Sequence, residues 1–103
     1  MSSELEDLLN KIQTFSDQRD WSQFHSAKNL ILAISAEVGE LAEVIQWKSD
    51  EEAAAYLNTS EGKSKLSEEV ADVAIYLIRL ADILDIDVAD VVRKKIAINE
   101  SRF

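Results

Sequence analysis

Two pairs of acidic residues have the spacing of ligands for a metal ion. Glu37 and Glu40 lie three residues apart, as do Glu69 and Asp72, so in a helix each pair presents two carboxylates on neighbouring turns. On a helical wheel, Glu37 and Glu69 each fall in the middle of an apolar stripe. The apolar residues within about 40° of them are Leu30, Ala33, Leu41 and Val44 for Glu37, and Val73, Tyr76, Leu80 and Ile83 for Glu69. The sequence therefore predicts four acids that face inward from two helices.

An inward-facing carboxylate needs a compensating charge, because removing an ionised group from water costs on the order of several kcal/mol. The chain offers few cations, with 11 Lys and Arg against 20 Asp and Glu. Clustered carboxylates with surplus negative charge suit a hard divalent cation, which usually keeps several waters. We therefore predict a Mg²⁺ site, with Mn²⁺ able to substitute, whose ligands and catalytic residues are Glu37, Glu40, Glu69 and Asp72. The alternative is that these acids lie at the stripe margin, solvated or paired with lysines, but the repeated spacing favours a metal.

Length and composition predict one all-α domain over residues 1–103. The chain has no proline, two glycines and 47 % hydrophobic residues, which favours helices over a sheet that needs many turns. A core of this size is marginal, so association would stabilise it. The net charge of -9 argues against a nucleic-acid polymer as partner. No signal peptide or membrane-spanning run is present, and the expected compartment is the cytoplasm.

Helical periodicity predicts a four-helix-bundle-like fold. The first helix is expected over residues 4–18 with a capping box from Ser3 and Glu6, and the second from residue 26 or 27 to 48. Asp50 is the expected N-cap of a short helix over 51–57, and Asp87 that of the last helix. A long helix over 63–84 lies between them. Residues 19–29 are predicted to form an ordered loop, and residues 58–62 the most flexible segment.

Several aromatic and amide side chains could form part of a nucleotide pocket. Asn29 and Trp47 line up with Glu40 along one edge of the acidic face, although Trp47 could equally be a dimer contact. Tyr76 lies one turn beyond Asp72, where its hydroxyl could bind a ligand or simply belong to the core. Trp21, in the loop, could stack on a base or cover the end of the bundle. Mid-helix Gly39 predicts the close approach of another helix.

The last helix carries polar residues where a simple bundle would place Leu or Ile. Lys95, Asn99 and Arg102 lie with Val88 and Val92 within about 60° of wheel. Such cations and an amide could bind phosphates. Alternatively, the end of the helix frays and Arg102 is solvated, while Lys95 keeps its apolar stem against the protein and places its ammonium in water.

The combination favours a ligand that is anionic, metal-bound and partly flat, as a nucleoside triphosphate is. Mg²⁺ on the acids would bridge phosphate oxygens and activate a water. No glycine-rich phosphate loop is present, which argues against a P-loop enzyme. A di-iron centre would require Glu-x-x-His pairs, and the one histidine, His25, lies outside both acidic pairs. The alternative is a non-enzymatic helical module in which a metal stabilises oligomerisation or binding.

The chain resembles the all-α nucleoside triphosphate pyrophosphohydrolases of the MazG-like superfamily. Their signature is a Glu-x-x-Glu pair followed by Glu-x-x-Asp, and the two acidic pairs match it. The chain is most similar to the short dCTP pyrophosphatase branch. The segments that carry this similarity are Arg19-Asp20-Trp21, Phe24-His25, Lys28-Asn29-Leu30, Glu37 to Glu43, Gln46-Trp47, and Lys95 with Asn99 and Arg102.

The resemblance implies hydrolysis of deoxynucleoside triphosphates such as dCTP to the monophosphate and pyrophosphate, which removes unwanted nucleotides from the pool. It also implies a homodimer or a dimer of dimers, with sites near subunit interfaces. The four acids would be the Mg²⁺ ligands, and Glu43 could assist as an outer ligand or proton acceptor. The substrate-binding residues would be Trp21, Lys28, Asn29, Trp47, Tyr76, Lys95, Asn99 and Arg102. The base preference is not fixed by the sequence, because stacking rings accept every base.

Overall fold

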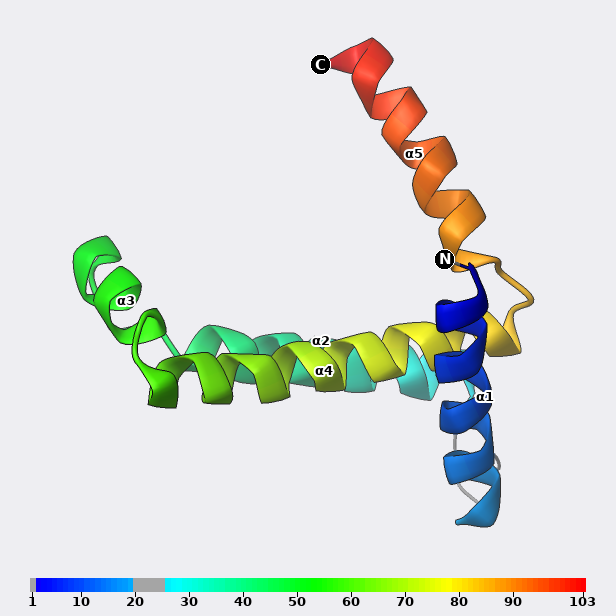
Figure 1. Ribbon diagram of the computed structural model, residues 1–103, viewed down its shortest axis with the longest axis horizontal. Helices are drawn as coiled ribbons and strands as arrows, with labels where there is room; N and C mark the ends of the chain where they lie inside the picture. The colour runs from blue at the N-terminus through cyan, green and yellow to red at the C-terminus, as the bar shows by residue number, and fades with distance from the viewer. Residues whose placement is uncertain (1, 20–25) are drawn as a thin grey trace.

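The computed structural model describes residues 2–19 and 26–103, and these residues form five helices and no strand. The helices are α1 (Ser2–Gln18), α2 (Ala27–Glu43), α3 (Asp50–Leu57), α4 (Ser60–Ile83) and α5 (Val88–Arg102) (Figure 1). The all-α prediction is therefore confirmed. The predictions for Trp21, Phe24 and His25 lie outside the described residues. No described helix combines the length and apolarity that crossing a membrane requires.

The antiparallel pair of α2 and α4 is the centre of the molecule (Figure 1). α1 crosses the C-terminal half of α4, and α3 packs against its N-terminal end. α5 leaves the pair beyond the end of α4 and makes few contacts with the other described helices. The two predicted acidic segments are thus on the two helices that share the most extensive interface.

The N-cap predicted at Asp87 is confirmed, and the one predicted at Asp50 is wrong. Ser26 caps α2 by accepting the Asn29 N–H at 3.1 Å, and Asp87 caps α5 by accepting the Asp90 N–H at 3.0 Å. The cap of α3 is Ser49 and not Asp50, which is the first helical residue. Ser49 forms a capping box with Glu52, in which each side chain accepts the backbone N–H of the other residue. Two bonds at this position outweigh the single bond that Asp50 could offer.

Three predicted boundaries differ from the structure. α1 already includes Ser3, so Ser3 is not its cap. α2 ends at Glu43 and not at residue 48, because the N–H groups of Val44 and Ile45 bond to carbonyls only three residues back. Residues 58–62, which were predicted to be the most flexible segment, instead include the N-cap and the first residues of α4. Its cap, Thr59, accepts the Gly62 N–H at 2.9 Å and donates to the Tyr56 carbonyl at 2.6 Å.

α4 ends in a turn that fixes where α5 departs. Asp85 adopts a left-handed backbone conformation with φ of 55°. Its N–H donates to the Asp82 carbonyl at 3.2 Å, and the Ile86 N–H donates to the Ala81 carbonyl at 2.8 Å. These two bonds form a Schellman motif, which satisfies carbonyls at a helix end. Aspartate tolerates the left-handed region better than most residues.

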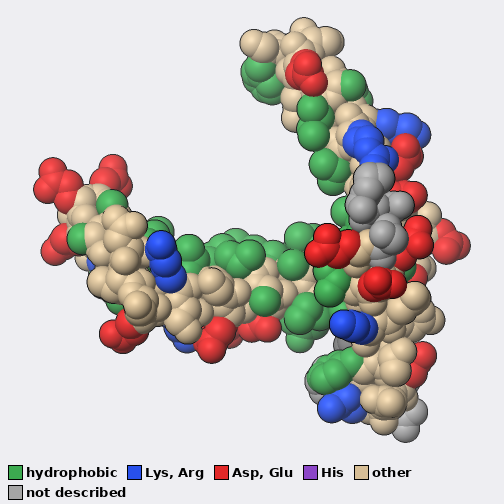
Figure 2. Space-filling view, in the orientation of Figure 1, with side chains coloured by type: hydrophobic (Ala, Val, Ile, Leu, Met, Phe, Trp, Pro, Cys, Tyr) green, Lys and Arg blue, Asp and Glu red, His purple; other side chains and the backbone are tan. Residues whose placement is uncertain are grey.

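The isolated chain buries little of its apolar surface. Among the described hydrophobic residues, only Leu30 and Ala81 are buried. The radius of gyration is 16.2 Å, against about 12.8 Å for a compact domain of this length. The accessible surface is 7708 Å², against about 5,800 Å² for a monomer of this mass. Figure 2 shows hydrophobic side chains along one face of the α2–α4 pair and on α5. Association, as predicted from the sequence, would bury this surface.

We expect Gly62→Ala to lower the free energy of unfolding by about 1–3 kcal/mol, as overpacking commonly does. A Cβ on Gly62 would overlap the Tyr56 carbonyl oxygen and lie 2.8 Å from its carbon, where the backbone cannot easily move. Urea denaturation followed by circular dichroism measures the change.

Gly39→Ala is the matched control. A Cβ on Gly39 meets nothing within 4 Å among the described residues, so none of the described helices makes the close approach that was predicted here. Alanine here should leave stability unchanged or raise it by about 1 kcal/mol. Equal effects of the two substitutions would contradict the packing argument.

Candidate metal centre

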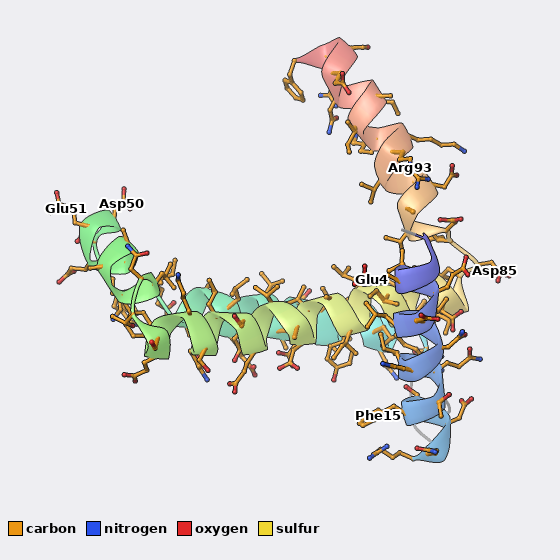
Figure 3. The ribbon with its side chains drawn as sticks, viewed as in Figure 1. Glu4, Phe15, Asp50, Glu51, Asp85 and Arg93 are labelled. Carbon is orange, nitrogen blue, oxygen red and sulfur yellow. The ribbon has the colours of Figure 1, made fainter. Side chains whose placement is uncertain are left out.

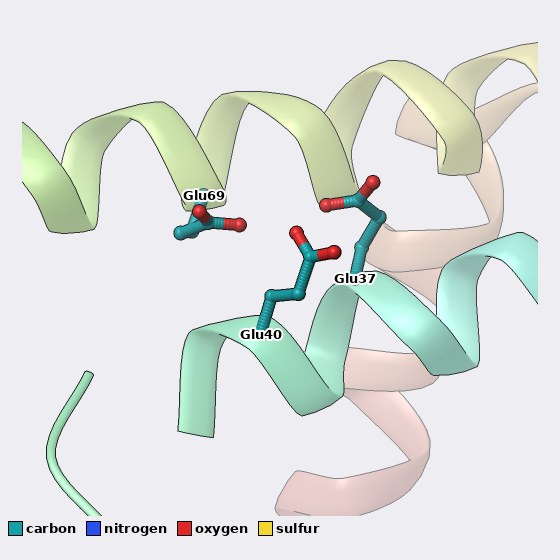
Figure 4. Close-up of side chains that lie close together, drawn as sticks. All are labelled: Glu37, Glu40 and Glu69. Atoms are coloured by element: carbon teal, nitrogen blue, oxygen red, sulfur yellow. The ribbon is translucent and has the colours of Figure 1, made fainter. Parts of the chain in front are cut away.

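Three carboxylates from α2 and α4 meet between the two helices. Glu37 and Glu40 project from α2 toward α4, and Glu69 comes from α4 (Figure 4). One oxygen from each lies within 4.8 Å of the others. Oxygens on opposite sides of a Mg²⁺ ion are about 4.2 Å apart, twice the ordinary Mg–O distance. We call Glu37, Glu40 and Glu69 the acidic trio, and its span is close to that of a common ligand shell.

Two oxygens of the acidic trio are buried and lack a hydrogen-bond partner among the described residues. They are Oε2 of Glu37 and Oε2 of Glu69. The other Glu69 oxygen has Lys65 Nζ at 3.6 Å. A buried acceptor without a partner costs about 1–3 kcal/mol, and more if it is charged. Carboxylate oxygens of this kind fit a hard divalent cation, which would satisfy both.

The electrostatics of Glu37 lead to the same conclusion. Burial raises the pKa of this carboxyl above its ordinary value, and the nearby negative charges of Glu40, Asp72 and Glu69 raise it further. Glu40 also raises this pKa through a side-chain hydrogen bond. Without a cation, the ionised form of Glu37 is therefore disfavoured. A bound divalent ion would reverse this balance.

The four acids predicted to face inward differ within this chain: Glu40 belongs to the acidic trio although it is exposed, and Asp72 lies outside the trio. Glu69 is 7 % exposed and Glu37 is half-buried, but Glu40 and Asp72 are both exposed. Each exposed acid lies three residues, about 60° of wheel, from the centre of its apolar stripe, and so reaches the margin of the α2–α4 interface. Asp72 is outside the acidic trio, although its charge acts on Glu37.

Two hollows flank the acidic trio along the helix pair. The first, which we call the aromatic hollow, has a volume of about 440 Å³ between α1 and α4, and its lining residues are Lys11, Ile12, Phe15, Ser16, Asp72, Ile75, Tyr76 and Arg79. Figure 3 shows Phe15 projecting from α1 on the side of the α2–α4 pair. The second, the lysine hollow, has a volume of about 400 Å³, and its lining residues are Glu40, Glu43, Val44, Tyr56, Lys65 and Glu69. Along α4, the lysine hollow is lined by Lys65 and by Glu69 of the acidic trio, and the aromatic hollow begins at Asp72.

The other predicted site residues are not members of the acidic trio. Tyr76 lines the aromatic hollow beside Asp72. Lys28 and Asn29 are exposed in the first turn of α2. Trp47 is not on the helical strip predicted for it, because α2 ends before it, and it is 89 % exposed.

The inward orientation predicted for the last helix is wrong within the single chain. Lys95 and Arg102 are exposed and Asn99 is half-buried. The reason is that α5 extends away from the α2–α4 pair after the Asp85 turn (Figure 3). The Arg102 guanidinium instead lies 5.1 Å from the centre of the Phe103 ring.

Sequence reasoning missed the residues that flank the acidic trio. Lys65 precedes Glu69 by four residues, a spacing that could have indicated the ion pair. Buried Arg79 pairs with Asp82 at 3.3 Å and lines the aromatic hollow. The sequence did not indicate that α1 contributes to that hollow, because helical periodicity does not identify which helices pack against one another.

Comparison with known proteins identifies relatives over nearly the whole chain. The dCTP pyrophosphatase 1 proteins of Mus musculus and Homo sapiens are each 42 % identical over 99 residues, which cover 96 % of this chain. The chain spans 58 % of the length of these two relatives. A crystal structure of a pyrophosphatase from Archaeoglobus fulgidus superposes with a TM-score of 0.90 at 39 % identity, covering 97 % of this chain and 92 % of that one.

The family comparison includes both acidic pairs. The model of the MazG-like family matches residues 32–102, which contain Glu37, Glu40, Glu69 and Asp72. This match extends over more than half of the chain, and it confirms the resemblance inferred from the two acidic pairs. The chain belongs to the MazG-like family.

Proposed function

We propose that residues 1–103 form one domain that hydrolyses nucleoside triphosphates to the monophosphate and pyrophosphate in a Mg²⁺-dependent reaction. The expected substrates are deoxynucleoside triphosphates such as dCTP, and the expected role is removal of unwanted nucleotides from the cytoplasmic pool. The observation that carries the proposal is the acidic trio, whose two buried oxygens lack a hydrogen-bond partner in the described part of the chain, beside two hollows. The dCTP pyrophosphatase 1 relatives support the substrate class.

The acidic trio would hold Mg²⁺, with Asp72 beside it as the fourth acid. When bound, the ion supplies charge neutralisation at the phosphate oxygens and lowers the pKa of a coordinated water; Mn²⁺ could substitute. In the reaction, a water oxygen forms a bond to the α-phosphorus while the bond from that phosphorus to the α–β bridging oxygen breaks. Pyrophosphate leaves and one proton is released. Glu43, on the wall of the lysine hollow, could accept this proton.

The aromatic hollow would receive the nucleoside. The rings of Phe15 and Tyr76 and the apolar side chains around them suit a flat base. Asp72, whose charge acts on Glu37, also lines this hollow. We retain Trp21 and Trp47 as proposed stacking residues, with Trp47 alternatively at a subunit contact. Lys28 and Asn29 are proposed to bind substrate from the first turn of α2.

A second copy of the chain would bring Lys95, Asn99 and Arg102 to the phosphates. Within one chain these residues lie on α5, away from the acidic trio. The exposed apolar surface of the chain supports association. We therefore propose a homodimer or a dimer of dimers, with no nucleic-acid polymer or membrane as partner.

We expect millimolar Mg²⁺ to raise the melting temperature of the wild-type protein, because the ion would bind the folded acidic trio and not the unfolded chain. Glu37→Gln should remove most of this shift. Differential scanning fluorimetry with and without Mg²⁺ tests both expectations, and Glu68→Gln, an exposed position on the same helix as Glu69, is the control. No Mg²⁺ shift in the wild type would count against the site.

The raised pKa of Glu37 also predicts a pH dependence. In the metal-free protein, the folded state holds the Glu37 proton more tightly than the unfolded state does, so this residue's contribution favours folding below its ordinary pKa and is lost as pH rises through the raised pKa. Glu37→Gln should therefore melt at a higher temperature than the metal-free wild type at pH 7. A lower melting temperature for this variant would contradict the argument.

We expect Glu37→Gln and Asp72→Asn each to lower the rate of pyrophosphate release at least about 100-fold, since a metal contributes several kcal/mol to such reactions. A coupled pyrophosphate assay with a panel of nucleotides measures the rate and the base preference. Circular dichroism should show that both variants remain folded. Full turnover in both would remove these acids from the mechanism, and release of orthophosphate would change the reaction class.

A further inference from the structure

The two hollows on either side of the acidic trio differ in chemical character. The aromatic hollow is apolar, with the rings of Phe15 and Tyr76 in its wall. The lysine hollow is polar, and its described lining residues include three carboxylates and the ammonium of Lys65. A nucleoside triphosphate differs in the same way between its two ends. If the base lies in the aromatic hollow, the terminal phosphates point past the acidic trio into the lysine hollow.

Lys65 lies where it can reach an anion in this hollow. Its Nζ is 3.6 Å from Oε1 of Glu69, which is longer than a hydrogen bond. Its side chain is 53 % exposed, whereas that of Glu69 is 9 % exposed. The ammonium therefore remains adjustable and can offer its three donors to another acceptor. Lys48, the neighbouring cation at this end, lies over the Tyr56 ring at 4.9 Å.

We propose that Lys65 binds the terminal phosphates of the substrate, and the released pyrophosphate, in the lysine hollow. This proposal rests on the proposed function and names a further binding residue for it. Three carboxylates and one ammonium leave the hollow with a net charge of about -2, which repels an anion. Pyrophosphate should therefore bind only when a divalent ion is present. Oε2 of Glu69 is buried and has no hydrogen-bond partner within residues 2–19 and 26–103, and at this atom such an ion would connect the hollow to the acidic trio.

A purely structural role for Lys65, as a counter-ion that orients Glu69, makes a different prediction. If Lys65 only orients Glu69, its loss should weaken the binding of Mg²⁺ and of Mg²⁺-pyrophosphate together. If Lys65 binds phosphate, its loss removes a like charge from the neighbourhood of the ion. Affinity for Mg²⁺ alone should then stay the same or increase, while affinity for pyrophosphate decreases.

The test compares Lys65→Met, which keeps the apolar stem and removes the charge, with Lys65→Arg and Lys63→Met. Lys63 is exposed on the same helix and does not line the hollow. Lys63→Met has the same net charge as Lys65→Met and is therefore the control for the loss of one positive charge. Isothermal titration calorimetry measures binding of Mg²⁺ alone, and of pyrophosphate at saturating Mg²⁺. We expect Lys65→Met to weaken pyrophosphate binding about tenfold or more, as for loss of a charge-assisted hydrogen bond. Lys65→Arg and Lys63→Met should bind as the wild type does.

Equal pyrophosphate affinity in Lys65→Met and Lys63→Met would overturn the proposal, and so would a parallel loss of Mg²⁺ and pyrophosphate affinity. Turnover of dCTP by the wild type is measured separately. If the wild type releases pyrophosphate and Lys65→Met binds it normally, this proposal fails and the proposed function stands. If the wild type does not hydrolyse any triphosphate but Lys65→Met loses pyrophosphate binding, the binding site stands and the function fails.

Discussion

The main physical constraint at the centre of this structure is the repulsion between carboxylates that helix packing holds close together. Glu37, Glu40 and Glu69 meet because α2 and α4 pack antiparallel over most of their length. Like charges at such distances oppose one another, and partial burial strengthens the opposition. Helix packing holds the groups together, and the raised pKa of Glu37 reflects the cost. Protonation of Glu37 or a nearby positive charge would relieve this repulsion.

The features that could be predicted from the sequence are the local ones. Helical periodicity and three-residue spacing depend on neighbouring turns, so the all-α class and the placement of Glu37 and Glu69 on facing stripes followed from the sequence. The cap predicted at Asp87 is local in the same sense. The true end of α2 was missed because it depends on which bonds the last turn makes, and the predicted position of Trp47 was wrong for that reason.

The features that could not be predicted depend on contacts between distant elements. Periodicity identifies an apolar face but does not say whether that face is covered by the same chain or by another. Val92 and Ile96 on α5 have the spacing of core residues, and in this chain they are 49 % and 52 % exposed. The same ambiguity applies to Lys95 and Asn99. A helical wheel gives the positions of these residues around the helix axis, but it does not give the position of the helix relative to the other helices.

The direction of α5 is set by the hydrogen bonds around Asp85 and not by packing against the α2–α4 pair. α5 has 15 residues, and a substitution at Asp85 that disfavours the left-handed backbone conformation would strain this turn without changing any residue of the α2–α4 interface. The cationic segment and the carboxylates could thus diverge separately over evolution. Protein engineers could likewise vary the exposed Lys95 and Arg102 on α5 without changing the α2–α4 pair that carries the acidic trio.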